Sequence, residues 1–169
     1  MKKIKLTNLK PEQWEIYKKI KLKSLLTDPI AFAATHEQAV AYSDEEWKQK
    51  LTKSGDIWLF AKYSEKFIGI IGAHTKNAGK ESSIATIVGV YVEPKYRGIG
   101  VGKLLMNKIL KDLKKHEEII KVKIWVAETQ IPAIDLYKSC GFKLIGKKKN
   151  EIFFEGKYFD ELIMEKEVT

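Results

Sequence analysis

The sequence predicts an α/β fold in which a mixed β-sheet carries helices on both of its faces. The first observation is the order of hydrophobic periods along the chain: a strand, then helices, then a run of strands, and finally strands that alternate with helices. The second is the composition, because 169 residues that are 44% hydrophobic and 31% charged suit a chain with its own core. The third is the absence of an internal repeat or a Pro-, Gly- or Ser-rich linker, which favours one domain over residues 1–169.

The N-terminal part predicts one short strand and two helices. Apolar and polar residues alternate over residues 4–7, as in a strand, and a helix is then expected from Pro11 to about Leu26. A capping-box pattern at residues 43–46 predicts a second short helix, which carries Trp47. The segment between the two helices, residues 30–42, has no pattern that assigns it.

The middle of the chain predicts three consecutive strands. Apolar residues alternate from Ile57 to Ala61, and after a polar turn a second strand runs from Phe67 to about Thr75, so the two are expected to form a hairpin. A turn at Asn77–Lys80 leads into a longer strand, Ile84–Val92. Gly89 inside that strand indicates a bulge or a close approach to the backbone.

Helices and strands alternate in the C-terminal part. Large apolar residues recur four apart from Gly100 to about Glu117, which predicts an amphipathic helix. A strand at Val122–Val126 and a helix from Pro132 to Cys140 follow. Two final strands are expected around Phe142–Ile145 and Phe159–Met164.

The charge and the cysteine count narrow the functions open to the chain. It has 31 Lys and Arg against 22 Asp and Glu, and the net charge of +9 favours an anionic partner: nucleic acid, an acidic membrane or a phosphorylated small molecule. Cys140 is the only cysteine, which excludes an intramolecular disulfide, favours a cytoplasmic location and makes a small buried hydrophobe the expected role. Apolar runs are too short for a membrane helix, and no signal peptide is expected.

The segment Val90–Leu105 carries the strongest chemical signal. It runs from an apolar strand through an Arg-containing turn directly into a helix, and the turn holds Gly98, Gly100 and Gly102. Glycines let a ligand approach the backbone, and a helix start offers unpaired N–H groups and a positive dipole, so the segment predicts a cradle for a phosphate. A tight turn without a ligand is the alternative. A P-loop is excluded because no Ser or Thr follows Lys103, and Lys103 also stands where a dinucleotide fingerprint needs its third glycine.

Two motifs give the chain a resemblance to a known family. The acyl-CoA-binding motif of the GNAT N-acetyltransferase superfamily, Arg/Gln-x-x-Gly-x-Gly/Ala, is matched by Arg97, Gly100 and Gly102. The second motif of the family, Asn-x-x-Ala-x-x-Leu-Tyr-x-x-x-Gly-Phe, is similar to residues 130–142. That segment has Gln130 in place of the usual Asn and matches the motif at Ala133, Leu136, Tyr137, Gly141 and Phe142. The closing segment, residues 156–166, also resembles the usual ending of the family.

The resemblance implies a fold, a cofactor and the residues that hold it. It implies a mostly antiparallel central sheet of about seven strands, an acyl-CoA-binding core at about 84–142 and an acceptor-side region at about 1–55. The pantetheine arm of acetyl-CoA would lie between the strands 84–92 and 122–126, and its pyrophosphate on the N–H groups of residues 97–103. The cofactor-binding residues implied in this way are Val90, Tyr91, Val92, Arg97, Gly98, Ile99, Gly100, Val101, Gly102, Lys103, Gln130 and Tyr137. No metal is expected.

The implied reaction moves an acetyl group from acetyl-CoA to a primary amine by direct attack in a ternary complex. Tyr137 stands where the family commonly places the general acid, and a half-buried helix aromatic without that role is the alternative. The general base stays open, because Ile84 and Trp125 occupy two positions where relatives often have glutamate. Besides a water relay, the candidates by their place at strand ends are His74, Glu93 and Glu128.

We expect the acceptor at the N-terminal helices and their connection, with Phe32, Trp47 and the turn Thr75–Lys80 near the acetyl group. A small primary amine, an amino-acid derivative and a protein N-terminus stay open, and the net charge disfavours a polyamine. Two other functions are weighed: a non-catalytic acyl-CoA-binding regulatory module of the same fold, and a nucleic-acid-binding domain, which is disfavoured because no basic surface interleaved with aromatics is visible. Lys147–Lys149 is expected to be a solvated turn. A homodimer is frequent among similar proteins and stays open here.

Overall fold

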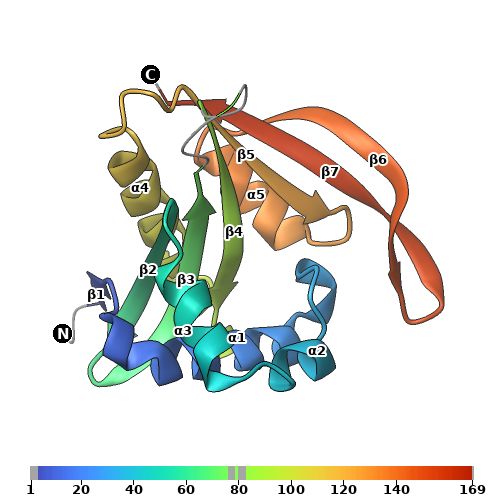
Figure 1. The fold of residues 1–169 in the computed structure, drawn as a ribbon. Coiled ribbons are helices and arrows are strands. Elements are labelled where there is room, and N and C mark those ends of the chain that lie inside the picture. Colours follow the sequence, from blue (N-terminus) through green and yellow to red (C-terminus); the bar gives the residue numbers. More distant parts are fainter. Residues whose placement is uncertain (1–3, 76–78, 80–82, 169) are drawn as a thin grey trace.

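The computed structural model describes residues 4–75, 79 and 83–168. In these residues the strands form one seven-stranded sheet in the order β1-β2-β3-β4-β5-β7-β6 (Figure 1). Neighbouring strands are antiparallel except β4 and β5, which are parallel, so the mixed and mostly antiparallel sheet is confirmed. The strands are β1 Ile4–Thr7, β2 Asp56–Tyr63, β3 Lys66–His74, β4 Ile84–Val92, β5 Lys121–Ala127, β6 Lys143–Phe154 and β7 Lys157–Glu167.

Helices cover both faces of the sheet, as expected. One core lies between the sheet and the N-terminal helices, and a larger one lies between the sheet and α4 with α5 (Figure 1). The helices are α1 Trp14–Thr27, α2 His36–Val40, α3 Asp44–Thr52, α4 Val101–Leu113 and α5 Ile131–Ser139, with 3-10 turns at Pro11–Gln13, Pro29–Ala31 and Pro94–Tyr96. No helix of the described segments combines the length and the apolar character that a membrane crossing requires.

Local chemistry explains where the helices form. In α4, Val101, Leu105, Ile109 and Leu113 recur four apart and are all buried against the sheet, and burial of such side chains stabilises by about 1.5–3 kcal/mol each. The start of α3 is fixed by the predicted capping box, in which the Glu46 carboxylate accepts a hydrogen bond from the Ser43 N–H at 2.7 Å.

Two stretches differ from the sequence-based expectation. Residues 30–42, which had no assigned pattern, contain the short helix α2, and its start is capped by Thr35 and Gln38 in the same reciprocal way. The expectation of a solvated turn at Lys147–Lys149 was wrong, because β6 continues to Phe154. Ion pairs between β6 and β7 stabilise this longer strand: the Lys147 Nζ lies 2.6 Å from a carboxylate oxygen of Asp160 on β7.

The sheet opens between β4 and β5. Their pairing is limited to Ile84–Thr86 against Lys121–Lys123. Beyond it Gly89 has a φ of +63°, and the register between β3 and β4 shifts next to it, so the predicted bulge is confirmed. Gly89 is required there by its backbone conformation, and also because a Cβ would lie 3.0 Å from the Trp58 ring. The bulge turns β4 away from β5 and leaves a gap on the edge of β4.

Candidate functional site

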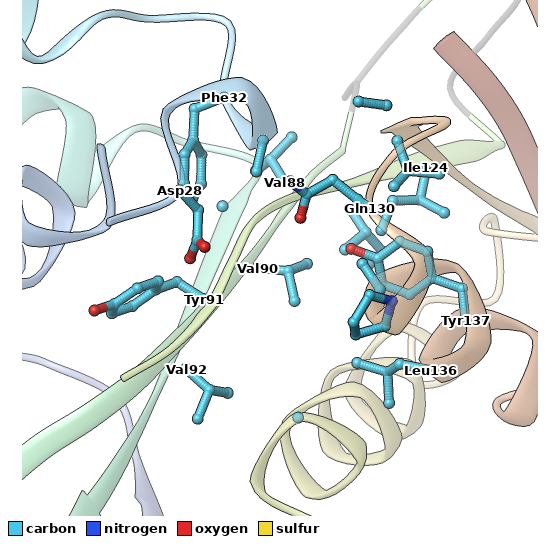
Figure 2. A pocket seen from close by; sticks show the side chains of 18 of the residues that line it. Asp28, Phe32, Val88, Val90, Tyr91, Val92, Ile124, Gln130, Leu136 and Tyr137 are labelled. Carbon is cyan, nitrogen blue, oxygen red and sulfur yellow. The ribbon is translucent and has the colours of Figure 1, made fainter. Parts of the chain in front are cut away.

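A cavity of about 620 Å³ fills the opening between β4 and β5, a size typical of sites for small molecules. Its walls come from β4, from β5, from the starts of α4 and α5, and from the chain that follows α1. Figure 2 shows Phe32 and Asp28 on one side of this space, Gln130 and Tyr137 on the other, and Val90 between them. The N-terminal region and the two motifs of the sequence therefore meet at one cavity.

The turn before α4 presents main-chain donors to the cavity. Gly98 and Gly100 have φ values of +77° and +90°, and a Cβ on either would meet open space, so glycine is needed here for backbone conformation. The N–H groups of residues 98–103 have no hydrogen-bond acceptor within the described part of the chain. Lys103 is exposed beside them and forms no ion pair with any described residue. This set of donors fits a phosphate.

Three residues of the first motif have surroundings that the sequence did not suggest. The lack of a side chain at Gly102 makes room for Leu136 of α5, whose Cδ2 lies 3.0 Å from the position of a Cβ. Ile99 is 63% exposed and does not line the cavity. The Arg97 guanidinium is held by protein: Nε donates to the Val92 carbonyl at 2.8 Å, and both terminal nitrogens donate to the Asp28 carboxylate at 3.3 and 2.5 Å. Arg97 thus ties the end of α1 to the turn.

After Thr86, the edge of β4 that faces β5 has no strand partner in the described part of the chain. Val90 and Val92 line the cavity, and the free edge can accept an extended group as an added strand. Tyr91 borders the cavity too, but its ring is buried in the core under α1 and points away from Tyr137 (Figure 2). Its hydroxyl lies 3.4 Å from the Thr27 hydroxyl, so the Tyr91 side chain has a packing role.

Tyr137 lies on the α5 side of the cavity, near Gln130 (Figure 2). Only 5% of the residue is exposed, and its ring packs 6.2 Å from that of Phe142. Burial raises the pKa of the phenol, so it stays protonated at neutral pH. Its hydroxyl has no hydrogen-bond partner among the described residues. Tyr137 therefore offers an uncommitted O–H donor to whatever occupies the cavity.

The three candidate bases do not line the cavity, and each lies close to another ionisable side chain. The His74 Nδ1 lies 2.8 Å from Asp56. The Glu93 Oε1 lies 2.8 Å from Lys23 and 2.7 Å from Lys66; burial raises the pKa of Glu93, but hydrogen bonds from these lysines outweigh it and hold the pKa below its ordinary value. The Glu128 carboxylate binds Lys147 at 3.0 Å and the Asp160 N–H at 3.2 Å. Their position at strand ends therefore does not bring them to the cavity wall.

The cavity has three charged lining residues that sequence reasoning missed: Lys21, Asp28 and Glu161. Burial, and to a smaller extent the charge of Lys50, lowers the pKa of Lys21 from 10.5 to about 8. Glu161 on β7 is partly buried and lies 3.5 Å from the Lys148 Nζ. Nothing in the sequence distinguishes Lys21 from other lysines of its helix, or Glu161 from other acidic residues of its strand.

Two side chains that were expected near the acceptor, Phe32 and Trp47, lie in different surroundings. Phe32 lines the cavity, but Trp47 is 1% exposed and packs 5.6 Å from the rings of Tyr17 and Tyr42, so it belongs to the core. Of the turn Thr75–Lys80, all but Thr75 and Gly79 lies outside the described residues. A second cavity shares Phe32 and Glu161 with the first and continues between α2 and the β6–β7 hairpin.

Within residues 4–75, 79 and 83–168, no group of three or more His, Cys, Asp or Glu side chains is arranged to hold a metal ion. Cys140 is buried at the end of α5, as a small apolar residue would be.

Known proteins resemble both the sequence and the fold. Residues 15–142 match the model of the acetyltransferase (GNAT) family. The L-amino acid N-acetyltransferase AaaT of Escherichia coli K12 is 24% identical over 123 residues, which are 72% of this chain and 75% of that protein. An acetyltransferase of the GNAT family from Streptococcus pneumoniae has a TM-score of 0.87 at 19% identity, with 99% of this chain and all of that chain covered. YncA, a putative acetyltransferase of Salmonella typhimurium solved with its cofactor acetyl-CoA, has a TM-score of 0.80 at 14% identity, with 99% and 95% covered.

Proposed function

The chain belongs to the acetyltransferase (GNAT) family, and on this basis we propose that it moves the acetyl group of acetyl-CoA to a primary amine by direct attack in a ternary complex. The observation that carries the proposal is the cavity between β4 and β5, which joins free main-chain donors at the start of α4 to the uncommitted hydroxyl of Tyr137. A single cavity with both features suits a ligand that has a phosphate at one end and a reactive group at the other.

Acetyl-CoA would supply the activated thioester, and the residues of this chain would hold it. The N–H groups of residues 98–103 and the Lys103 ammonium fit the pyrophosphate. The free edge of β4 at Val90 and Val92 fits the amide groups of the pantetheine arm, and Gln130 adds a side-chain amide on the α5 side. Arg97 holds the turn in place through Asp28, so its contribution is positioning.

Acyl transfer requires a neutral amine and a proton for the departing thiolate. We assign the proton donor to Tyr137, because its phenol is neutral and faces the cavity. We assign the acceptance of the amine proton to Glu161, through water, because it lines the cavity and its contact with Lys148, at 3.5 Å, is longer than the two-point contact between Asp28 and Arg97. The main-chain N–H groups of Val90 and Val92 would donate hydrogen bonds to the acetyl oxygen.

The acceptor would enter from the side of Phe32, where the two cavities join. A small primary amine, an amino-acid derivative and a protein N-terminus are the classes to compare; the name of the Escherichia coli relative favours amino acids. The single cysteine, Cys140, favours a cytoplasmic site of action.

The proposal is tested by thiol release from acetyl-CoA with a panel of amines, amino acids and short peptides, together with a calorimetric titration of CoA. Turnover that depends on one acceptor class supports the proposal and names the acceptor. Failure to bind CoA would show that the cavity has another ligand.

One observation keeps an alternative in view, a regulatory module that binds acyl-CoA without turnover: the candidate bases His74, Glu93 and Glu128 do not line the cavity. The variant Tyr137→Phe separates the two. If Tyr137 donates the proton, kcat falls by about 10²-fold while the Kd of CoA is unchanged. An unchanged kcat would remove Tyr137 from the mechanism, and an inactive wild-type protein that binds CoA tightly would favour the module.

A further inference from the structure

Lys21 extends from α1 to the wall of the cavity at the bulge of β4. Its Nζ lies 3.5 Å from the position that a Cβ on Gly89 would take. The same atom lies 4.2 Å from the centre of the Phe32 ring, which lines the acceptor side of the cavity. The Lys21 ammonium therefore lies between the Phe32 ring and the main chain at Gly89, one residue before Val90.

Among the residues that the structure describes, the charge of Lys21 has no acidic partner. No carboxylate of a described residue lies within 4.0 Å of its Nζ, and the ammonium instead contacts the Phe32 ring. The two carboxylates on the cavity wall are engaged elsewhere, Asp28 with Arg97 and Glu161 with Lys148. Lys50 adds a further positive charge nearby. A ligand with a negative charge can therefore supply the counterion that the ammonium on the cavity wall lacks.

We propose that Lys21 binds a carboxylate of the acceptor, so that the substrates are amines with a carboxylate close to the attacked nitrogen. The inference rests on the proposed function and names its substrate class. In an α-amino acid the nitrogen and the carboxylate carbon are separated by two bonds of about 1.5 Å each. Along a strand each residue advances by about 3.3 Å, which is similar to the span from the carboxylate to the nitrogen of the amino acid. Because Lys21 lies at Gly89, a carboxylate bound to Lys21 would leave the amine beside the next residue, Val90. The same chemistry arises when the first residue of a peptide has an acidic side chain.

The test compares wild-type protein with Lys21→Met and Lys21→Arg on matched acceptors at pH 7. The first pair is leucine and leucinamide, and the second is two short peptide amides that begin with Asp or Asn. If Lys21 binds the carboxylate, Lys21→Met raises the KM of the acid of one pair by about 10- to 100-fold and leaves its amide unchanged. Lys21→Arg retains the preference, because it keeps the charge. The pair that responds identifies the source of the carboxylate.

Controls separate this role from others. Lys19→Met changes an exposed lysine of the same helix and should leave every KM unchanged. If Lys21 were a general base, both Lys21 variants would lower kcat on acid and amide alike, because arginine does not deprotonate. Equal kcat/KM losses for acid and amide in Lys21→Met would overturn the proposal, although transfer to amines would stand.

A binding measurement covers the case in which no amine is acetylated and the proposed function fails. The affinities of N-acetyl-leucine and N-acetyl-leucinamide for the CoA-saturated protein are then measured by calorimetry. The inference predicts at least about tenfold tighter binding of the acid, lost in Lys21→Met and retained in Lys21→Arg. Equal affinities for the two ligands in the wild-type protein refute it.

Discussion

Replacement of Lys21 by Met is expected to stabilise the protein at pH 7 while it impairs the acceptor site. The folded chain keeps a partly buried ammonium that has no carboxylate partner among the described residues, and desolvation together with the charge of Lys50 lowers the pKa of Lys21 from 10.5 to about 8. A pKa difference of one corresponds to about 1.4 kcal/mol, so the charge costs about 3 kcal/mol of folding free energy at pH 7. Met has a similar length and helix propensity. Loss of the contact with the Phe32 ring offsets about 1 kcal/mol, which leaves an expected gain of about 2 kcal/mol.

The stability that Lys21→Met gains over the wild-type protein should decrease as the pH rises. Below about pH 8, Lys21 is protonated in both the folded and the unfolded chain, and the folded wild type bears the full cost. Between about 8 and 10.5 the unfolded chain binds the proton and the folded chain does not, so the wild-type protein gains stability as the pH rises. The advantage of Lys21→Met should therefore shrink over this window and be small at pH 10.5.

Urea unfolding followed by tryptophan fluorescence at pH 7 and at pH 10 measures both free energies, with the protein free of ligand. Lys19→Met, on the exposed side of the same helix, should change the free energy of unfolding by less than about 0.5 kcal/mol at either pH. A destabilised Lys21→Met protein at pH 7, or a difference that does not change with pH, would show that Lys21 does not carry an uncompensated buried charge.

Three further predictions concern the cofactor end, the base and the core. Gly100→Val should weaken CoA binding in a titration by at least about tenfold, because valine disfavours a φ of +90°; Gly156→Val, also at a positive φ but in the β6–β7 turn, should keep the affinity, and the reverse result would contradict the cradle. Glu161→Gln should lower kcat at pH 7 by about 10- to 100-fold and recover at higher pH, where the amine deprotonates unaided; a pH-independent loss would argue against a base. Trp47→Phe should change the free energy of unfolding in urea by up to about 2 kcal/mol and leave the acceptor KM unchanged, since Trp47 lies in the core; a raised KM would restore it to the acceptor side.

The glycine turn and helix start that we propose for the cofactor could be predicted, because this part of the cavity is local in sequence. The strand, the glycine turn and the start of α4 lie within residues 84–105, and each is encoded by short-range chemistry. Gly100 must be glycine for its φ of +90°, and the apolar spacing of α4 fixes which side faces the sheet. The bulge at Gly89 belongs to the same group, since a glycine inside an apolar strand often marks a bulge.

The opposite end of the cavity, which we propose for the acceptor, was not predictable, because distant segments build it. Lys21 and Glu161 come from α1 and β7, and each lies in a stretch where similar charges recur. The surroundings of the base candidates were hidden for the same reason: the neighbour of His74 is Asp56, which lies on the adjacent strand. Trp47 shows the limit for apolar residues, since an amphipathic pattern does not distinguish a core side chain from one that faces a ligand.

The pattern of ion pairs explains what the net charge of +9 means for function. Many lysines outside the cavity are matched locally: Lys23 and Lys66 share Glu93, and Lys147 binds both Glu128 and Asp160. Such pairs interrupt the continuous positive surface that nucleic-acid binding would need. The two lysines on the cavity wall have no acidic partner among the described residues: Lys103 lies at the turn before α4, and Lys21 at the bulge of β4. Their separation along one cavity favours a reaction between two anionic ligands, one held by its phosphate and the other by its carboxylate.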